Sequence, residues 1–539
     1  MSATGTDTER RLVSRNPATG AELGSVAATA PDGVAGVIEA VSKVQPLWAL
    51  LRVRDRARYM GRMAQAVIDD FDELAELLVA ELGRPRAEVA TLELLVAIDA
   101  LQWIAGEGAE ALSGRRVGTS RSVAPAKRAR IAYEPYGVVG VIGAGSAAFA
   151  QPLGQIAGAL LAGNGVAFKP AGRACLAGER IARVIGRAGL PEGLVRVIHG
   201  GAEVGIALAE APVDKILFTG SPAVGRAVAR ACVSREKEVT VELGGKDAML
   251  VLADAHLPRA VAGALWAGCA GAGQARGSIE RVYVAREVHE PFLAALVRGA
   301  RALRVGDPAD ERTQIGPLAT ARRLEHVVEL LEDAVALGAK VHCGEALAPS
   351  GPPALFGAFH SATVLTGVTP EMRIAREPID GPVLTVQAVD SEDEAIALAN
   401  DSDYSLGASV WTADRYRGTR IARELHAGMV WLNDHLPGPM VARGPWGAAA
   451  GGGLGRTLGE AGLRACAQEK LITWDPPALR GLWWGPYDNA TARAARVLAK
   501  ARSARESDRH GAWRGGALSV ARVLARTFGR GVPQGPRRR

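Results

Sequence analysis

The chain has 539 residues, of which 48% are hydrophobic and 22% charged, and its formal net charge is +7. This length and composition predict a globular protein with a large core and more than one domain. No run of eighteen apolar residues is free of charges, so we expect no membrane span. Residues 1–24 lack the basic-then-apolar pattern of a secretory signal, which makes a cytoplasmic location the expectation.

Five cysteines are scattered along the chain without a CxxC pair, and their number is odd. This pattern argues against a disulfide framework and against a metal site. We expect each of them to be a small buried hydrophobic residue. The cysteines are Cys175, Cys232, Cys269, Cys343 and Cys466.

The positive charge is concentrated at the C-terminal end. Residues 476–539 contain fourteen arginines or lysines against three acids, a net charge of +11, whereas residues 1–475 carry a net −4. The main body is therefore mildly acidic, and a basic C-terminal extension follows it.

The order of elements is that of an α/β protein. Residues 30–112 show helical periodicity, with a helix stop and restart around Pro85, and a basic, turn-rich stretch follows at 113–130. Short apolar runs then alternate with helical ones, which predicts βαβ units, a mostly parallel sheet and two α/β lobes. The expected strands cover residues 136–142, 165–168, 194–198, 215–218, 239–243, 281–284, 383–389 and 409–411.

Two short motifs lie where these lobes should meet. In Glu242-Leu243-Gly244-Gly245-Lys246 an acid ends an apolar run and paired glycines let the backbone turn closely beside a ligand. Gly273-Gln274-Ala275-Arg276 follows beyond a helix-like stretch. With the supporting motifs, this pair resembles the active-site centre of the aldehyde dehydrogenase superfamily over residues 13–475. The supporting motifs are Asn16-Pro17-Ala18-Thr19-Gly20, Lys169-Pro170, residues 188–193, Phe218-Thr219-Gly220-Ser221, residues 398–401, residues 430–434 and Pro445-Trp446-Gly447.

The resemblance implies an aldehyde dehydrogenase-like α/β fold with a Rossmann-like cofactor domain, a catalytic domain and a β oligomerisation arm that joins subunits into a homodimer or homotetramer. The arm would extend the sheet of a neighbouring subunit. The implied boundaries are 13–112 and 136–244 for the nucleotide-binding domain, 245–461 for the catalytic-type domain, 113–135 and 462–475 for the arm, and 476–539 for the basic extension.

The resemblance also assigns roles to single positions. Glu242 occupies the position of the general base, Arg276 that of the nucleophilic cysteine, and Ser146 that of the asparagine that holds the oxyanion. NAD or NADP would lie beside a helix N-terminus that offers free N–H groups to a phosphate. The glycine-rich segment 138–148 reads as a tight strand-to-helix turn, because no acid follows it at the spacing of a dinucleotide fingerprint. The implied cofactor-binding residues are Lys169, Gly220, Ser221, Gly225 and Leu243.

An arginine at the nucleophile position changes the chemistry. Oxidation of an aldehyde by a nicotinamide needs a group that adds to the carbonyl and later leaves as an acyl-enzyme, which a thiolate does well. A guanidinium stays protonated and has only donors, so it cannot act as that group. We predict that Arg276 and Glu242 approach within ion-pair distance, because an arginine in that cleft needs a partner.

Other departures fall at the same site. Gly172 stands where the family has an acid after the Lys-Pro pair, residues 377–382 lack the ribose-binding glutamate and the nicotinamide-side phenylalanine, and residues 448–456 lack a lysine and a serine. Two hypotheses follow. The chain is an inactive or strongly impaired member kept as a binding or assembly subunit, or it is an active NAD(P)-dependent aldehyde dehydrogenase that uses a displaced thiol such as Cys269.

The basic extension has two interpretations. Paired tryptophans at 483–484 precede basic residues at helical spacing, Arg493, Arg496 and Lys500, and residues 518–528 repeat the theme. Tryptophans beside a basic amphipathic helix suit peripheral contact with an anionic membrane. Alternatively the aromatic part packs on the body and the arginine-rich end is disordered. No motif supports nucleic-acid binding, and we expect no nucleic-acid partner.

Overall fold

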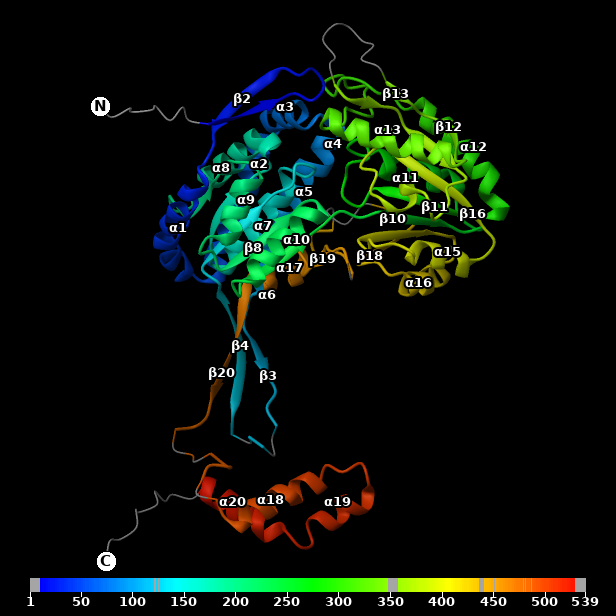
Figure 1. Ribbon diagram of the computed structural model, residues 1–539. Coiled ribbons are helices and arrows are strands. Elements are labelled where there is room, and N and C mark those ends of the chain that lie inside the picture. The colour runs from blue at the N-terminus through cyan, green and yellow to red at the C-terminus, as the bar shows by residue number, and fades with distance from the viewer. Residues whose placement is uncertain are drawn as a thin grey trace, which may run out of the picture. The chain divides into compact units, whose positions relative to one another are not determined.

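The computed structural model describes most of the chain (Figure 1). By the contacts between its residues, the chain divides into two compact units, Met1–Leu112 with Glu134–Gln468 and Ser113–Tyr133 with Glu469–Arg539. The described residues are 10–120, 123–124, 126–347, 357–435, 441–449, 451–477, 479, 481–485 and 487–528.

The first lobe of the larger unit is built on a six-stranded sheet with the order β19-β9-β8-β5-β6-β7. Its five successive strands β5 to β9 run parallel, as the alternation of strands and helices predicts, and β19 joins β9 in the antiparallel direction. The strands are β5 (Val138–Ile142), β6 (Gly165–Lys169), β7 (Val195–Val197), β8 (Lys215–Thr219), β9 (Glu238–Glu242) and β19 (Gly453–Leu454).

Helices cover this sheet on both faces (Figure 1). The helical stretch before Pro85 is broken at Asp70 into Val53–Asp69 and Phe71–Leu82, and the second helix ends at Gly83, whose left-handed backbone (φ +67°) closes it. The helices of this lobe are η1 (Pro31–Gly33), α1 (Val34–Ala49), α2 (Val53–Asp69), α3 (Phe71–Leu82), α4 (Arg86–Glu88), η2 (Val89–Leu94), α5 (Leu95–Trp103), η3 (Ile104–Gly108), α6 (Ala109–Ala111), α7 (Ala150–Ala162), η4 (Gly172–Ala174), α8 (Cys175–Arg187), α9 (Ala202–Glu210), α10 (Pro222–Val233) and α17 (Gly459–Ala465).

Among the described residues of this lobe, the helical stretch Arg86–Ala111 is long and apolar enough to cross a membrane, judged by length and composition alone. Its α5 segment packs against α2 and α7 inside the larger unit. Glu88, Glu93 and Asp99 interrupt its apolar sequence, so it contains no charge-free run of eighteen residues. Its buried contacts are those of a core helix of this lobe.

The second lobe is built on a seven-stranded sheet with the order β12-β15-β16-β11-β10-β17-β18, parallel except at β12. One apolar cluster packs α11, α12 and α13 on one face, and another packs α15 and α16 on the other. Its elements are β10 (Asp247–Val251), α11 (Leu257–Cys269), β11 (Ile279–Ala285), α12 (Arg286–Ala302), α13 (Ala321–Ala336), β12 (Lys340–Cys343), β15 (Thr363–Thr366), α14 (Arg373–Arg376), β16 (Val383–Val389), α15 (Glu392–Asn400), β17 (Gly407–Trp411), α16 (Arg415–Glu424) and β18 (Met429–Leu432).

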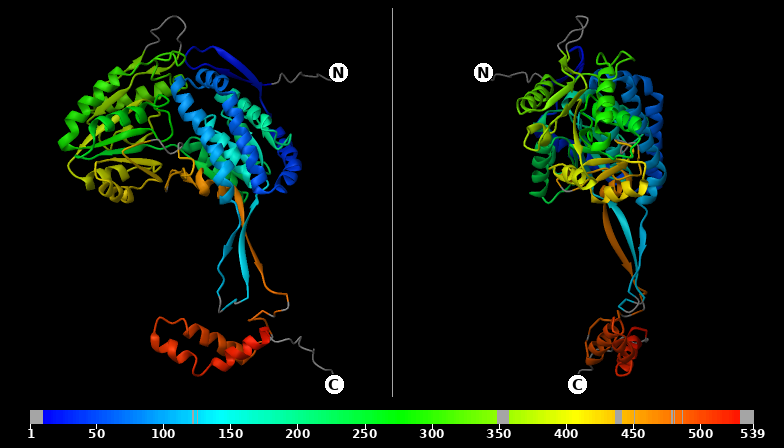
Figure 2. Two further views of the ribbon diagram at one scale, coloured as in Figure 1. Left: turned by 180° about the vertical axis from the view of Figure 1, so that it is seen from behind. Right: turned by 90° about the vertical axis from the view of Figure 1, so that its right-hand side faces the viewer.

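The smaller unit contains a three-stranded sheet with the order β20-β4-β3, followed by three helices (Figure 2). Its elements are β3 (Arg115–Val117), β4 (Arg128–Pro135), β20 (Ala467–Trp474), α18 (Asn489–Lys500), α19 (Glu506–Ala512) and α20 (Ala517–Phe528). Two short hairpins complete the chain, β1 (Arg11–Arg15) with β2 (Glu22–Ala27) and β13 (Ala346–Leu347) with β14 (Phe359–His360). The extension is therefore folded over residues 489–528, where disorder was one of the two expectations.

Candidate active site

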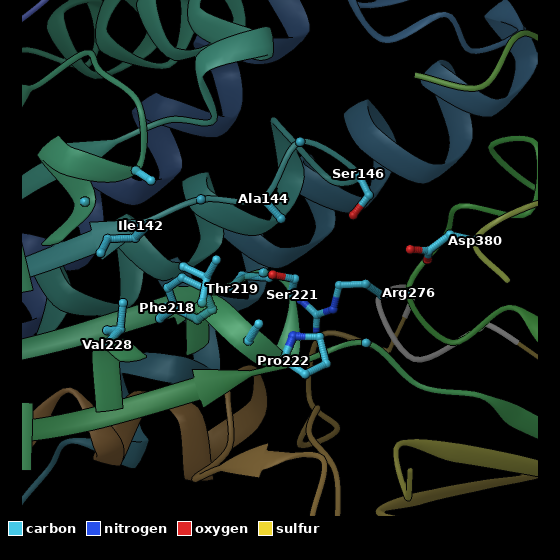
Figure 3. A pocket seen from close by; sticks show the side chains of 18 of the residues that line it. Ile142, Ala144, Ser146, Phe218, Thr219, Ser221, Pro222, Val228, Arg276 and Asp380 are labelled. Carbon is cyan, nitrogen blue, oxygen red and sulfur yellow. The ribbon is translucent and has the colours of Figure 1, made fainter. Parts of the chain in front are cut away.

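The carboxyl ends of neighbouring parallel strands bring the site together. Ile142 at the end of β5 pairs with Lys169 at the end of β6, and Thr219 at the end of β8 pairs with Glu242 at the end of β9. Ligands of open α/β sheets bind at this edge. A cavity of about 650 Å³ opens beside it, and Ser221 and Arg276 both line it (Figure 3).

Glu242 is buried and closely held. Its carboxylate accepts from the Gln151 amide and from the Thr457 hydroxyl. Backbone pairing of Glu242 with Gly453 of β19 brings Thr457 near, so Gly453–Leu454 of the late segment form an edge strand on β9. The carboxylate is thereby fixed at the carboxyl end of β9.

A tight loop after α11 places Arg276. Gly271, Ala272, Gly273 and Gly277 all have positive φ in this loop. A Cβ on Gly273 would lie 2.0 Å from the carbonyl oxygen of Gly381, so glycine is required there. The Gly-Gln pair of the motif therefore has a structural role in shaping the loop that ends at Arg276.

Arg276 and Glu242 form a buried ion pair, as predicted from the sequence. Nη2 of Arg276 lies 2.6 Å from Oε2 of Glu242, and the two side chains are 10% and 2% exposed. Burial raises the pKa of Glu242, and the Arg276 charge opposes that rise. Nε of Arg276 is buried without a hydrogen-bond partner among the described residues. In Figure 3 the guanidinium extends toward Ser221 and Pro222.

A second, apolar cavity of about 100 Å³ lies on the other side of Arg276. Its walls are mostly aliphatic or aromatic, and Arg276 and Ser146 line this cavity as well as the larger one. Arg276 therefore lies between the large cavity, which Lys169 and Arg173 also line, and an apolar pocket. The apolar wall consists of Leu92, Val96, Ala100, Trp446 and Leu458.

Ser146 belongs to a loop held by a second buried ion pair. Arg84 lies 3.1 Å from Glu93 and donates to the carbonyl oxygen of Ser146. Glu93 also accepts the N–H groups of Phe149 and Ala150, the first donors of α7. A carboxylate at a helix N-terminus stabilises that end, so this pair fixes the loop between β5 and α7.

The expected cofactor residues separate into two groups. Lys169, Gly220 and Ser221 line the large cavity. Gly225 lies behind it, where a Cβ would come 2.4 Å from Leu243, so these two residues pack against each other. Burial lowers the pKa of Lys169, and the Glu203 charge opposes this.

Comparison with known proteins gives a family match over most of the chain. The family model described as "Aldehyde dehydrogenase family" matches residues 4–472. The chain belongs to the aldehyde dehydrogenase family. It is 34% identical to the betaine aldehyde dehydrogenase of Cereibacter sphaeroides (strain ATCC 17029 / ATH 2.4.9), covering 85% of this chain and 92% of that protein. It is 35% identical to that of Sinorhizobium fredii, with the same two coverages.

Solved structures of the family share the fold. An aldehyde dehydrogenase of Mycobacterium tuberculosis complexed with NAD+ superposes with a TM-score of 0.82 at 32% identity, covering 86% of this chain and 95% of that one. An NAD+ complex of an aldehyde dehydrogenase from Bacillus cereus superposes with a TM-score of 0.81 at 30% identity, covering 86% and 93%. Relatives within the family have thus been crystallised with NAD+.

Arg173 is a site residue of this aldehyde dehydrogenase-family protein that the sequence analysis did not single out. It lines the large cavity, and a Cβ on Gly145 would come 2.3 Å from its Nε, so the guanidinium lies directly over that glycine. Burial, with the nearby charges of Arg323 and Arg84, lowers the pKa of Arg173 to about 10. In the sequence, its only signal is its place one residue after Gly172, the position at which the resemblance expects an acid.

The segment 377–382 closes the cavity on the side of the second lobe. Asp380 adopts a positive φ of 52° and lies 2.6 Å from Arg323. Glu280 accepts the N–H of Ile379 at 3.0 Å and pairs with Lys246 at 2.5 Å. The segment is therefore well anchored although it lacks the ribose-binding glutamate.

Cys269 lies away from both cavities. It ends α11 within the apolar cluster of the second lobe and is 5% exposed. Burial raises the pKa of its thiol to about 12, and the Glu88 charge adds to the rise. At neutral pH this thiol is protonated and poorly accessible.

Proposed function

We propose that this chain is a nucleotide-binding member of the aldehyde dehydrogenase family that does not oxidise aldehydes through a covalent enzyme intermediate. The buried ion pair between Arg276 and Glu242 carries this proposal. At the nucleophile position it places a group that cannot add to a carbonyl, and it neutralises the carboxylate that would activate water.

The remaining contacts of Glu242 support the same conclusion. A general base needs a free carboxylate within hydrogen-bond reach of a water molecule. Here the two oxygens already accept from Gln151 and Thr457 and face Arg276. Ser146 also lacks the amide donor that would stabilise an oxyanion. Nucleophile and oxyanion donor are thus replaced, and the carboxylate at the base position is engaged by Arg276.

The large cavity fits the phosphate half of a dinucleotide. Its volume of about 650 Å³ lies in the usual range for ligand pockets. The N-terminus of α10 at Ser221 faces it, and the positive ends of Lys169 and Arg173 line it. A helix N-terminus with adjacent cations suits a pyrophosphate. At the ribose end Pro378 supplies no carboxylate, so we expect weaker binding there.

The substrate named for two relatives, betaine aldehyde, suits the apolar pocket poorly. That aldehyde carries a quaternary ammonium, whose favourable partner is an aromatic face. Here Trp446 is already faced by Arg276, whose Cζ lies 5.9 Å from the ring centroid, and Arg84 lines the same pocket. We therefore propose no betaine aldehyde activity for this chain.

Activity through Cys269 is the alternative. Its thiol would have to leave an apolar cluster and lose a proton that its pKa of about 12 retains at neutral pH. The cost of both steps weighs against this route. Iodoacetamide that abolished a measured turnover would favour it.

We further propose that the chain forms a homodimer or homotetramer in the cytoplasm. The strand β20 supports this proposal because Leu471 and Trp474 are 62% and 52% exposed along it. Because β20 lies at the edge of its three-stranded sheet, its free side is available for pairing with another copy. Light scattering coupled to size exclusion tests the proposal, and a monomer at all concentrations would contradict it.

The experiment for the central proposal measures binding and turnover separately. Binding of NAD+ and NADP+ is followed by calorimetry, and reduced dinucleotide is followed at 340 nm with a broad aldehyde panel. We expect binding without turnover in the wild type and in Glu242→Gln. Turnover that requires Glu242 would overturn the proposal.

A further inference from the structure

The C-terminal helices form a small folded unit with its own core. Val497 of α18 packs with Val520 and Val523 of α20, and Ala512 of α19 completes the cluster. Val520 and Val523 lie within residues 518–528, the stretch that the sequence analysis considered for contact with a membrane. They face inward instead, which leaves a different face of α20 at the surface.

That outer face of α20 is apolar. Five residues at helical spacing define it, and all of them are exposed. The most exposed of its large side chains, Leu518 and Phe528, are 79% and 52% exposed. On a helical wheel the five residues span about 120°. This apolar stripe consists of Leu518, Ala521, Leu524, Ala525 and Phe528.

The surroundings of the apolar stripe are strongly basic. Residues 481–528 contain nine arginines or lysines and three acids, a net charge of +6, and all nine cations are exposed. Arg522 and Arg526 follow one border of the stripe at helical spacing. Of the acids, Asp488 is paired with Arg526, and Asp508 accepts from the Ser503 hydroxyl at 3.1 Å. Glu506 and Asp508 keep their negative charges, and the cations of the unit still outnumber its acids by six.

We propose that the apolar stripe of α20 binds the surface of an anionic lipid bilayer. An amphipathic helix lies in the plane of the interface with its apolar face among the acyl chains and its cations against the headgroups. Trp484, Tyr487 and Trp513 are 69%, 79% and 47% exposed in the same unit, and aromatic side chains of this kind favour the headgroup region. This function is additional to the dinucleotide cleft and independent of it.

Charge and apolarity together favour lipid over the other possible occupants. A second copy of the chain would bring another +6 unit against this one, which is unfavourable. Nucleic acid would satisfy the cations but leave the apolar stripe in water, since phosphate contacts dominate such binding. A bilayer with anionic headgroups satisfies both features.

The test uses the full chain and sedimentation with vesicles of phosphatidylcholine, with or without phosphatidylglycerol. The variant Leu518→Ser/Phe528→Ser removes the largest side chains of the stripe. Leu50→Ser is the matched control, because Leu50 is 80% exposed on the larger unit. We expect the wild type and Leu50→Ser to bind anionic vesicles equally, and the double variant to bind at least about tenfold more weakly.

Three further results follow from the proposal. Neutral vesicles bind little protein, roughly 0.5 M salt releases it from anionic ones because screening weakens the attraction, and both variants retain the wild-type unfolding temperature. Equal binding of the double variant, equal binding to neutral vesicles, or failure to sediment with anionic vesicles would overturn the proposal. Self-association without vesicles that the double variant abolishes would also overturn it, since a second copy would then cover the stripe.

Discussion

Replacement of Arg276 by methionine tests the buried ion pair. The variant leaves Glu242, whose side chain is 2% exposed, without a cationic partner. Breaking a buried pair in this way costs about 3–5 kcal/mol. The Glu242 carboxyl can avoid the cost of an unpaired buried charge by taking up a proton. From an ordinary pKa of 4.5 that uptake costs about 3.4 kcal/mol at pH 7, which caps the expected loss.

The loss depends on pH with a defined sign. In the variant the folded carboxyl keeps a proton that the unfolded chain releases above pH 4.5. The folded state therefore binds more protons than the unfolded state, and stability falls as pH rises, at about 1.4 kcal/mol per pH unit. Near pH 5 the loss shrinks to about 1 kcal/mol. Urea unfolding of Arg276→Met at pH 5, 6 and 7 measures this slope.

Two controls isolate the cause. Arg276→Met/Glu242→Gln removes both charges and should recover most of the stability, with a loss that no longer varies with pH. Arg323→Met breaks a pair of the same 2.6 Å separation whose side chains are 36% and 50% exposed, and should cost no more than about 1 kcal/mol. Equal losses for Arg276→Met and Arg323→Met at pH 7 would refute the reasoning.

Three further predictions follow from the site. Arg173→Ala should weaken dinucleotide binding about tenfold in calorimetry, because a charge-assisted contact is lost; unchanged affinity would remove Arg173 from the cleft. Burial raises the pKa of Glu88 to about 7, so its folded state holds a proton that the unfolded chain releases, and stability falls by up to about 3 kcal/mol from pH 4.5 to 7. Glu88→Gln should flatten that slope in thermal unfolding, and an unaltered slope would contradict the assignment. Cys269 should resist iodoacetamide in the native protein by mass spectrometry, and rapid labelling would contradict its burial.

The strands β5 to β9 of the first lobe, and β11, β16 and β17 of the second, could be predicted from the sequence because each is a short apolar run between turn signals. The strands β10, β12, β15 and β18 were not among the expected ones. The run at 383–389 coincides with β16, and that at 239–243 overlaps β9 to within one residue. The ion pair was predictable because the resemblance places Arg276 at the same site as Glu242, and a buried arginine needs a charged partner. These predictions rest on local pattern and on the cost of a buried charge.

Side-chain packing between distant segments could not be read in the same way. Arg173 lies over Gly145 because glycine has no side chain to occupy that space, and no pattern in either segment predicts the contact. Gly225, expected at the cofactor, makes room for Leu243, a contact that the sequence does not reveal. In α20 the periodicity shows two apolar faces, and the sequence does not indicate that α18 covers the one with Val520 and Val523.

The central claim is that the fold binds a dinucleotide but lacks the chemistry of aldehyde oxidation. Formation of NADH or NADPH by the purified wild type, with each dinucleotide and a broad aldehyde panel, tests it most directly when Glu242→Gln is run beside it. The account predicts no turnover above the Glu242→Gln background, in a preparation that binds the dinucleotide by calorimetry. Turnover in the wild type that disappears in Glu242→Gln would contradict it, because a hidden nucleophile would then be working with an active base.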